Sequence, residues 1–181
     1  IYWDDAIGDV VARRVRRLDA ILLQQQAVAL AADDPVADVL VGQLRARGLD
    51  AVFEDPQALR IRVGIMRALE PDAGWPDFSD AGLLASAHDW LPAWLQPGQG
   101  IRQLRSLPLE KILESLLGWD RQQQLDRALP THYDTSAGTR RRITYADDGT
   151  VVIALPLQEV LGLHQGPTLA DGRVIPALHL L

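Results

Sequence analysis

The spacing of apolar residues changes at Pro130, and this change constrains the fold more than any other feature of the chain. Before it, apolar residues recur every three or four positions, as on one face of a helix. The clearest such stripe is Leu109, Ile112, Leu113, Leu116 and Leu117. After it, residues 140–145 and 151–155 flank a short loop containing Asp148-Gly149, which is a hairpin signal. The sequence therefore predicts an α+β fold.

Start and stop residues indicate a central helical block over residues 31–129. Asp34-Pro35 and Asp55-Pro56 each combine an acceptor side chain with a proline suited to the first helical position. Gly48 is suited to end a helix, because glycine adopts the left-handed conformation without strain. Four tryptophans at helix boundaries or on apolar stripes are expected in the core: Trp75, Trp90, Trp94 and Trp119.

The two ends of the chain are shorter units. Within residues 1–30, the apolar residues Val11, Val15, Leu18 and Leu22 lie at helical spacing, so the pattern by itself favours a helix there. Residues 130–181 read as a β-rich unit, with a short helix from Pro156 and a last strand after Asp171-Gly172. This unit is too small to bury a core of its own and is expected to pack on other residues.

Composition excludes several classes of protein. The hydrophobic content of 48% is enough for a folded core, and the net charge of -6 argues against a globally basic nucleic-acid binder. The chain has no cysteine, which excludes disulfides and thiolate sites and fits a cytoplasmic protein. Because it has no apolar run of about 18 residues, no membrane-spanning segment is expected.

The densest positive charge follows Gly138, at Arg140, Arg141 and Arg142. Glycine lets a backbone approach an anion closely, and arginine offers paired donors to phosphate oxygens. Nearby, His132 and Tyr133 are candidates to stack on a base. The alternative is a solvated arginine face on a hairpin, balanced by nearby acidic residues.

A second basic cluster comprises Arg13, Arg14, Arg16 and Arg17. If this segment is a strand, its arginines point alternately to both faces, and one pair faces solvent or a phosphate. The alternative is an arginine-rich face that is paired with carboxylates such as Asp4, Asp5 and Asp9.

No catalytic or metal site is predicted. His132, Asp134 and Ser136 alternate along one segment, whereas a catalytic triad needs side chains that converge from separate elements. The histidines have no metal-ligand spacing. Glu110 and Glu114 are one helical turn apart and are expected to be surface charge rather than an acid–base pair.

Nearly the whole chain resembles the C-terminal region of HrpB-type bacterial ATP-dependent helicases of the DEAH/RHA group. The residues that carry the resemblance are Pro130, His132, Ser136, Gly138, Tyr145, Leu157 to Leu163 and Gly172-Arg173-Val174. Upstream, Trp90, Trp119, the segment 122–127 and Pro130 follow the family's order. The family usually has an aromatic residue where Leu161 stands, and the resemblance is weakest over residues 27–55.

The resemblance implies that residues 1–30 form a strand pair at the end of an oligonucleotide-binding-type barrel, and we adopt strands there. It also implies a helicase motor on the same polypeptide, with ATP and magnesium as that motor's cofactors. The chain itself has no phosphate-binding loop, since its single lysine, Lys111, follows no glycine loop. No cofactor is therefore expected in this fragment.

Two functions follow as hypotheses. In the first, the chain is a non-catalytic accessory fragment that contacts or guides single-stranded RNA or DNA, RNA in preference, for the motor domains of the same polypeptide. In the second, it is a protein-interaction or scaffolding module that regulates the motor. The acidic net charge favours this second hypothesis.

Overall fold

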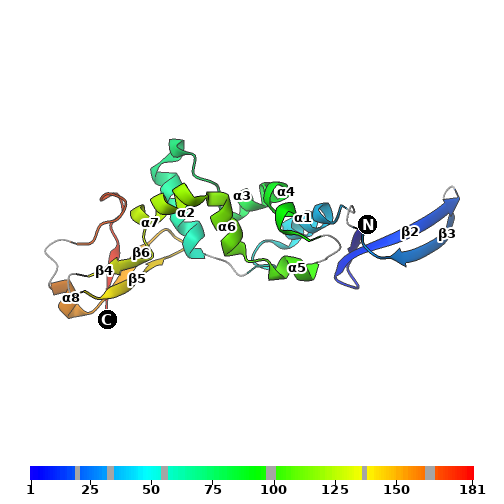
Figure 1. Cartoon of the computed structure of the whole chain (residues 1–181). Helices are drawn as coiled ribbons and strands as arrows, with labels where there is room; N and C mark the ends of the chain where they lie inside the picture. The colour runs from blue at the N-terminus through cyan, green and yellow to red at the C-terminus, as the bar shows by residue number, and fades with distance from the viewer. Residues whose placement is uncertain (19–20, 32–34, 54–56, 97–100, 136–137, 162–165) are drawn as a thin grey trace. The chain divides into compact units, whose positions relative to one another are not determined.

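The computed structural model describes residues 1–18, 21–31, 35–53, 57–96, 101–135, 138–161 and 166–181 (Figure 1). The chain forms two compact units. Unit 1 comprises Ile1–Asp55 and Asp80–Leu109, and unit 2 comprises Pro56–Ser79 and Glu110–Leu181. The predicted divisions after residues 30 and 129 fall inside these units, and the predicted helical block supplies helices to both of them.

Unit 1 begins with an antiparallel sheet of β1 (Tyr2–Asp4), β2 (Asp9–Leu18) and β3 (Ile21–Val28). The strand prediction is thus confirmed, although the apolar spacing alone favoured a helix. A tight turn between β1 and β2 starts the sheet. In this turn Gly8 has φ 69° and the Asp4 carboxylate accepts bonds from the amides of Ala6 and Ile7 at 3.1 and 3.3 Å.

The helices of unit 1 are α1 (Val36–Arg47), α3 (Asp80–Ala85), α4 (Ala87–Trp90), the 3-10 turn η2 (Pro92–Trp94) and α5 (Ile101–Ser106). Helix α1 begins at Val36, one residue later than predicted, because Pro35 is its N-cap rather than its first helical residue. Asp34 and Asp55-Pro56 lie outside the described residues. The core of the unit includes Leu40, Leu44, Leu83 and Leu91, each at most 1% exposed.

Unit 2 combines helices with a four-stranded sheet. Its helices are α2 (Gln57–Leu69), the 3-10 turn η1 (Pro71–Ala73), α6 (Leu109–Leu117), α7 (Trp119–Ala128) and α8 (Leu157–Leu161). Its strands are β4 (His132–Asp134), β5 (Arg140–Tyr145), β6 (Val151–Leu155) and β7 (Ala177–Leu180). They are ordered β4-β5-β6-β7, and only the β6–β7 pair among them is parallel. The predicted hairpin joins β5 to β6, with Gly149 at φ 82°.

Two residues predicted to be buried are exposed. Leu116 lies within the predicted apolar stripe of α6 but is 44% exposed, because the described part of the chain does not cover its side of the last turn, whereas Leu117 in the same turn is 5% exposed. Trp119 is 72% exposed. It is the first residue of α7 and lies about 240° around the helix from the buried Leu125, so it points away from the core.

No helix in the described part of the chain is long and apolar enough to cross a lipid bilayer. The alternating pattern of His132, Asp134 and Ser136 cannot be followed to its end, because Ser136 lies outside the described residues.

Candidate nucleic-acid interface

The register of β4 and β5 places Arg140 and Arg142 on one exposed surface of the second sheet. Arg142 lies opposite His132, and Arg140 lies opposite Asp134. Residues alternate between the two faces along a strand, and the exposure follows this alternation. Arg140, Arg142 and Thr144 are exposed, whereas Ile143 between them is buried.

The same surface continues across the other two strands. Val152 pairs with Thr144 and with Ala177, and Ala154 pairs with His179. We call this surface the open face: His132, Asp134, Arg140, Arg142, Thr144, Val152, Ala154, Ala177 and His179. None of these side chains is buried. The open face therefore carries two arginines and two histidines against one carboxylate, with small residues on β6 and β7.

Arg141 belongs to the opposite face of the sheet and is paired with a carboxylate. Its guanidinium donates to Glu159 of α8 at 2.6 Å, and the Thr139 hydroxyl donates to the same carboxylate at 3.1 Å. The bond from Arg141 holds the pKa of Glu159 below its usual range, and the carboxylate raises the pKa of Arg141. Arg141 thus anchors α8 to the sheet and is not presented with its two neighbours.

We expect the Arg141–Glu159 pair to make the stability of the protein sensitive to acid. Because the folded-state pKa of Glu159 is lowered, the stabilisation is present above the ordinary glutamate pKa of about 4.3 and is lost as pH falls through the folded value. The melting temperature of Glu159→Gln, measured by circular dichroism, should lie below that of the wild type at neutral pH and converge with it in acid. A difference that does not change with pH would contradict this role.

The other predicted members of this cluster are divided between the faces. Tyr133 lies opposite Arg141 in the register, so it shares the face of Arg141 rather than the open face. Gly138 is exposed in the turn before β5 with φ 77°. His132 is half-buried on the open face, and its Nδ1 lies 3.0 Å from the Thr131 hydroxyl.

Arg62 of α2 fixes the segment from which β4 starts, and the sequence prediction missed it. Its side chain is 5% exposed; Nε donates to the Leu129 carbonyl at 2.6 Å and Nη2 to Asp126 at 2.5 Å. The Tyr145 hydroxyl donates to the next carbonyl, that of Pro130, at 2.6 Å, and burial raises the pKa of this tyrosine to about 12.

A signal for Arg62 was present in the sequence. Leu59, Val63 and Met66 form the buried stripe of α2, and Arg62 lies three residues after Leu59 and four before Met66, on the same helix face. An arginine within an apolar stripe needs a buried partner, because an unpaired buried charge is costly.

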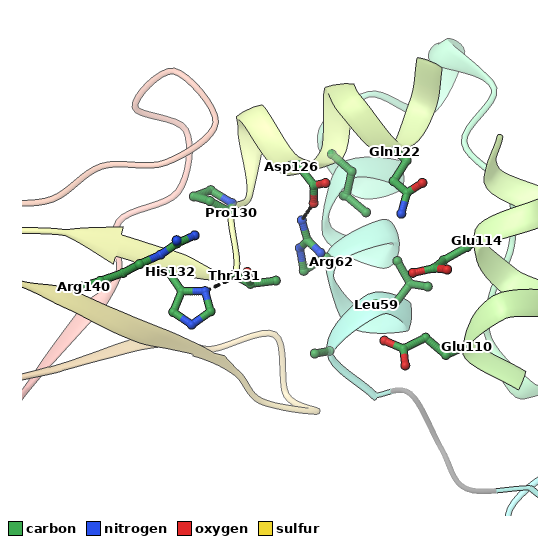
Figure 2. Close-up of a pocket in the computed structure, with 12 residues that line it drawn as sticks. Leu59, Arg62, Glu110, Glu114, Gln122, Asp126, Pro130, Thr131, His132 and Arg140 are labelled. Atoms are coloured by element: carbon green, nitrogen blue, oxygen red, sulfur yellow. Dashed lines mark hydrogen bonds and ion pairs between the residues drawn. The ribbon is translucent and has the colours of Figure 1, made fainter. Parts of the chain in front are cut away.

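A cavity of about 410 Å³ lies between the start of β4 and the helices α2, α6 and α7 of the same unit (Figure 2). His132 and Arg140 line it from the strands, and Glu110 and Glu114 line it from α6. Glu110 is exposed and Glu114 half-buried, so these carboxylates are solvent-accessible as predicted, but both contribute to a cavity wall.

The second arginine cluster lies in unit 1, on the β2–β3 hairpin. Arg13 forms an ion pair with Asp4 at 3.0 Å and lies 5.3 Å from the ring centre of Tyr2. Arg14 and Arg16 are exposed and lie opposite Gln26 and Gln24. Arg17 follows on β2, and its side chain falls outside the described part of the chain. The two arginine clusters therefore belong to different units.

Comparison with known proteins shows helicase relatives. Residues 90–181 match a family model described as ATP-dependent helicase C-terminal. The chain is 32% identical, over 183 residues, to the ATP-dependent RNA helicase HrpB of Escherichia coli (strain K12). The aligned region covers 100% of this chain and 23% of that protein.

Two solved structures are also similar. The crystal structure of E. coli DExH-box NTPase HrpB gives a TM-score of 0.79 at 33% identity, over 99% of this chain and 22% of that one. The crystal structure of Escherichia coli DEAH/RHA helicase HrpB gives a TM-score of 0.77 at 33% identity, over 99% of this chain and 23% of that one. The chain thus spans less than a quarter of the length of these relatives.

Proposed function

This chain belongs to the HrpB-type family of ATP-dependent helicase C-terminal regions, and we propose that it contacts single-stranded nucleic acid for a motor elsewhere in the same polypeptide. The chain itself is a non-catalytic accessory part, and ATP and magnesium belong to the motor. The name of the E. coli relative, an RNA helicase, favours RNA over DNA.

The open face is the observation that carries this proposal. The chain has a net charge of -6, yet this one surface holds Arg140, Arg142, His132 and His179 with Asp134 as its single acidic residue. Arg140 and Asp134 are 3.9 Å apart and both well exposed, so solvent weakens their attraction. No carboxylate is paired with Arg142 among the described residues. Both guanidinium groups are therefore available to phosphate oxygens.

The small residues of the open face fit the same role. Ala154 of β6 and Ala177 of the edge strand β7 have short side chains, so a strand of nucleic acid can lie close to the backbone there. Such contacts to the phosphate backbone fix position without reading sequence. That is what a motor translocating along any strand requires of an accessory surface.

A binding comparison tests this proposal. We expect the intact chain to bind a labelled single-stranded RNA at low salt, measured by fluorescence anisotropy, and Arg140→Ala/Arg142→Ala to bind roughly tenfold more weakly or worse, because two charge-assisted contacts are lost. The matched control is Arg67→Ala/Arg127→Ala, which removes the same charge from exposed positions on α2 and α7. If RNA binding weakened equally in both variants, the loss would come from net charge alone, and the open face would not be the binding surface.

Specific observations favour a second function, protein interaction or scaffolding. Leu157 and Leu161 lie one turn apart on α8 and are 52% and 78% exposed, and exposed apolar surface often marks an interaction site. Arg13 and Arg141 are both paired with carboxylates rather than free for phosphate. A folded chain that binds no RNA at low salt would favour this scaffold function.

A further inference from the structure

The cavity beside the open face has walls of opposite character (Figure 2). Arg140 supplies positive charge from the strands, and both Arg140 and His132 offer ring or guanidinium nitrogens for hydrogen bonds. Glu110 and Glu114 of α6 supply carboxylates across the cavity, with the Gln122 amide of α7 on the helical side. The cavity therefore suits a ligand that is anionic at one end and carries hydrogen-bond donors at the other.

These groups are not neutralised by one another. Arg62, which also lines the cavity, already has its own partners in Asp126 and the Leu129 carbonyl. Within the described part of unit 2, Glu110 and Glu114 form no ion pair with Arg62, His132 or Arg140. Both carboxylates keep their acceptor capacity for a ligand.

A nucleotide has this distribution of chemistry. Its phosphate is anionic, and cytosine, adenine and guanine each carry an exocyclic amine that donates hydrogen bonds, whereas uracil presents carbonyl acceptors in its place. Acidic side chains accept bonds from such amines, as in contacts to the N4 amine of cytosine. The volume of about 410 Å³ lies within the usual size of small-molecule sites, about 300 to 1,000 Å³.

We propose that this cavity is a base-selective subsite for one nucleotide of the bound strand, with the phosphate at Arg140 and His132 and the base amine at Glu110 and Glu114. The inference rests on the proposed function, because the strand reaches the cavity from the open face through Arg140, which belongs to both. It adds a preference for amine-bearing bases over uracil to contacts that are otherwise independent of sequence.

Oligocytidine and oligouridine of equal length, about 12 nucleotides, test this preference because they carry the same phosphate charge. We expect the intact chain to bind oligocytidine roughly tenfold more tightly, in line with one good contact to a base edge. Glu110→Gln/Glu114→Gln should bring the affinity ratio close to one, because amides also donate to uracil carbonyls. Circular dichroism checks the fold, and the single variants replace the double variant if it does not fold.

The control for charge is Asp72→Asn/Asp120→Asn, which removes two carboxylates from exposed positions of unit 2 outside the cavity and should keep the preference. Equal binding of both oligonucleotides by the intact chain would overturn the subsite while leaving the proposed function standing. A preference that survives the glutamate variants would also overturn it. Failure to bind either oligonucleotide would overturn the subsite and the proposed function together.

Discussion

Replacing Arg62 with methionine is expected to lower the free energy of unfolding by about 3 kcal/mol. Methionine fills much of the same space but cannot donate to the Leu129 carbonyl or to Asp126, which Arg62 contacts at 2.6 and 2.5 Å. The lost bonds leave a carbonyl at the end of α7 without its donor. Asp126 is about half exposed and can be solvated, which keeps the loss below that of a fully buried pair.

Urea unfolding followed by circular dichroism measures this loss. Arg67→Met on the same helix is the matched control, because both members of the Arg67–Asp77 pair are exposed to solvent over roughly half of their side chains. Pairs of this kind contribute about 0 to 1 kcal/mol. If both variants lost the same stability, the buried contacts of Arg62 would not be what holds the start of β4 in place.

Trp90→Ala is expected to lower the stability of unit 1 by about 3 to 5 kcal/mol, because it removes a large side chain from a packed core. Trp90 is 2% exposed, its ring lies 6.4 Å from that of Phe53, and its indole nitrogen donates to the Leu83 carbonyl at 3.1 Å. The measurement is urea unfolding followed by tryptophan fluorescence and circular dichroism.

Trp119→Ala is the control for this prediction. Trp119 is 72% exposed, and substitutions at such surface positions usually change stability by less than about 0.5 kcal/mol. If Trp119→Ala lowered the stability as much as Trp90→Ala, the assignment of Trp90 to the core and of Trp119 to the surface would be contradicted.

Local signals in the sequence predicted most of the helices and the β5–β6 hairpin. Proline, glycine and apolar spacing act over a few residues, so they predicted α1, the buried face of α2 and the Asp148-Gly149 turn. They failed at Trp119, because an aromatic residue at a helix start has no stripe to define its direction. For β2 and β3 the local pattern favoured a helix, and the family resemblance was needed to predict strands.

The candidate interface was only partly accessible from the sequence. Strand alternation places Arg141 on the opposite face from Arg140 and Arg142, but the sequence prediction grouped all three arginines as candidate phosphate contacts. The pairing of Arg141 with Glu159, 18 residues later, depends on how α8 packs on the sheet. The cavity likewise needs α2, α6, α7 and β4 together, and no local pattern records that packing.

The most direct test of the central claim is the salt dependence of RNA binding. The claim is that Arg140 and Arg142 contact phosphates, and each such contact on a single strand contributes about -0.7 to the slope of log Kobs against log salt. The slope should be measured between about 50 and 200 mM salt for the intact chain and for Arg140→Ala/Arg142→Ala. We predict that the intact chain has the steeper slope, by about 1.4 for two contacts. Identical slopes would contradict the claim that the open face binds the phosphate backbone.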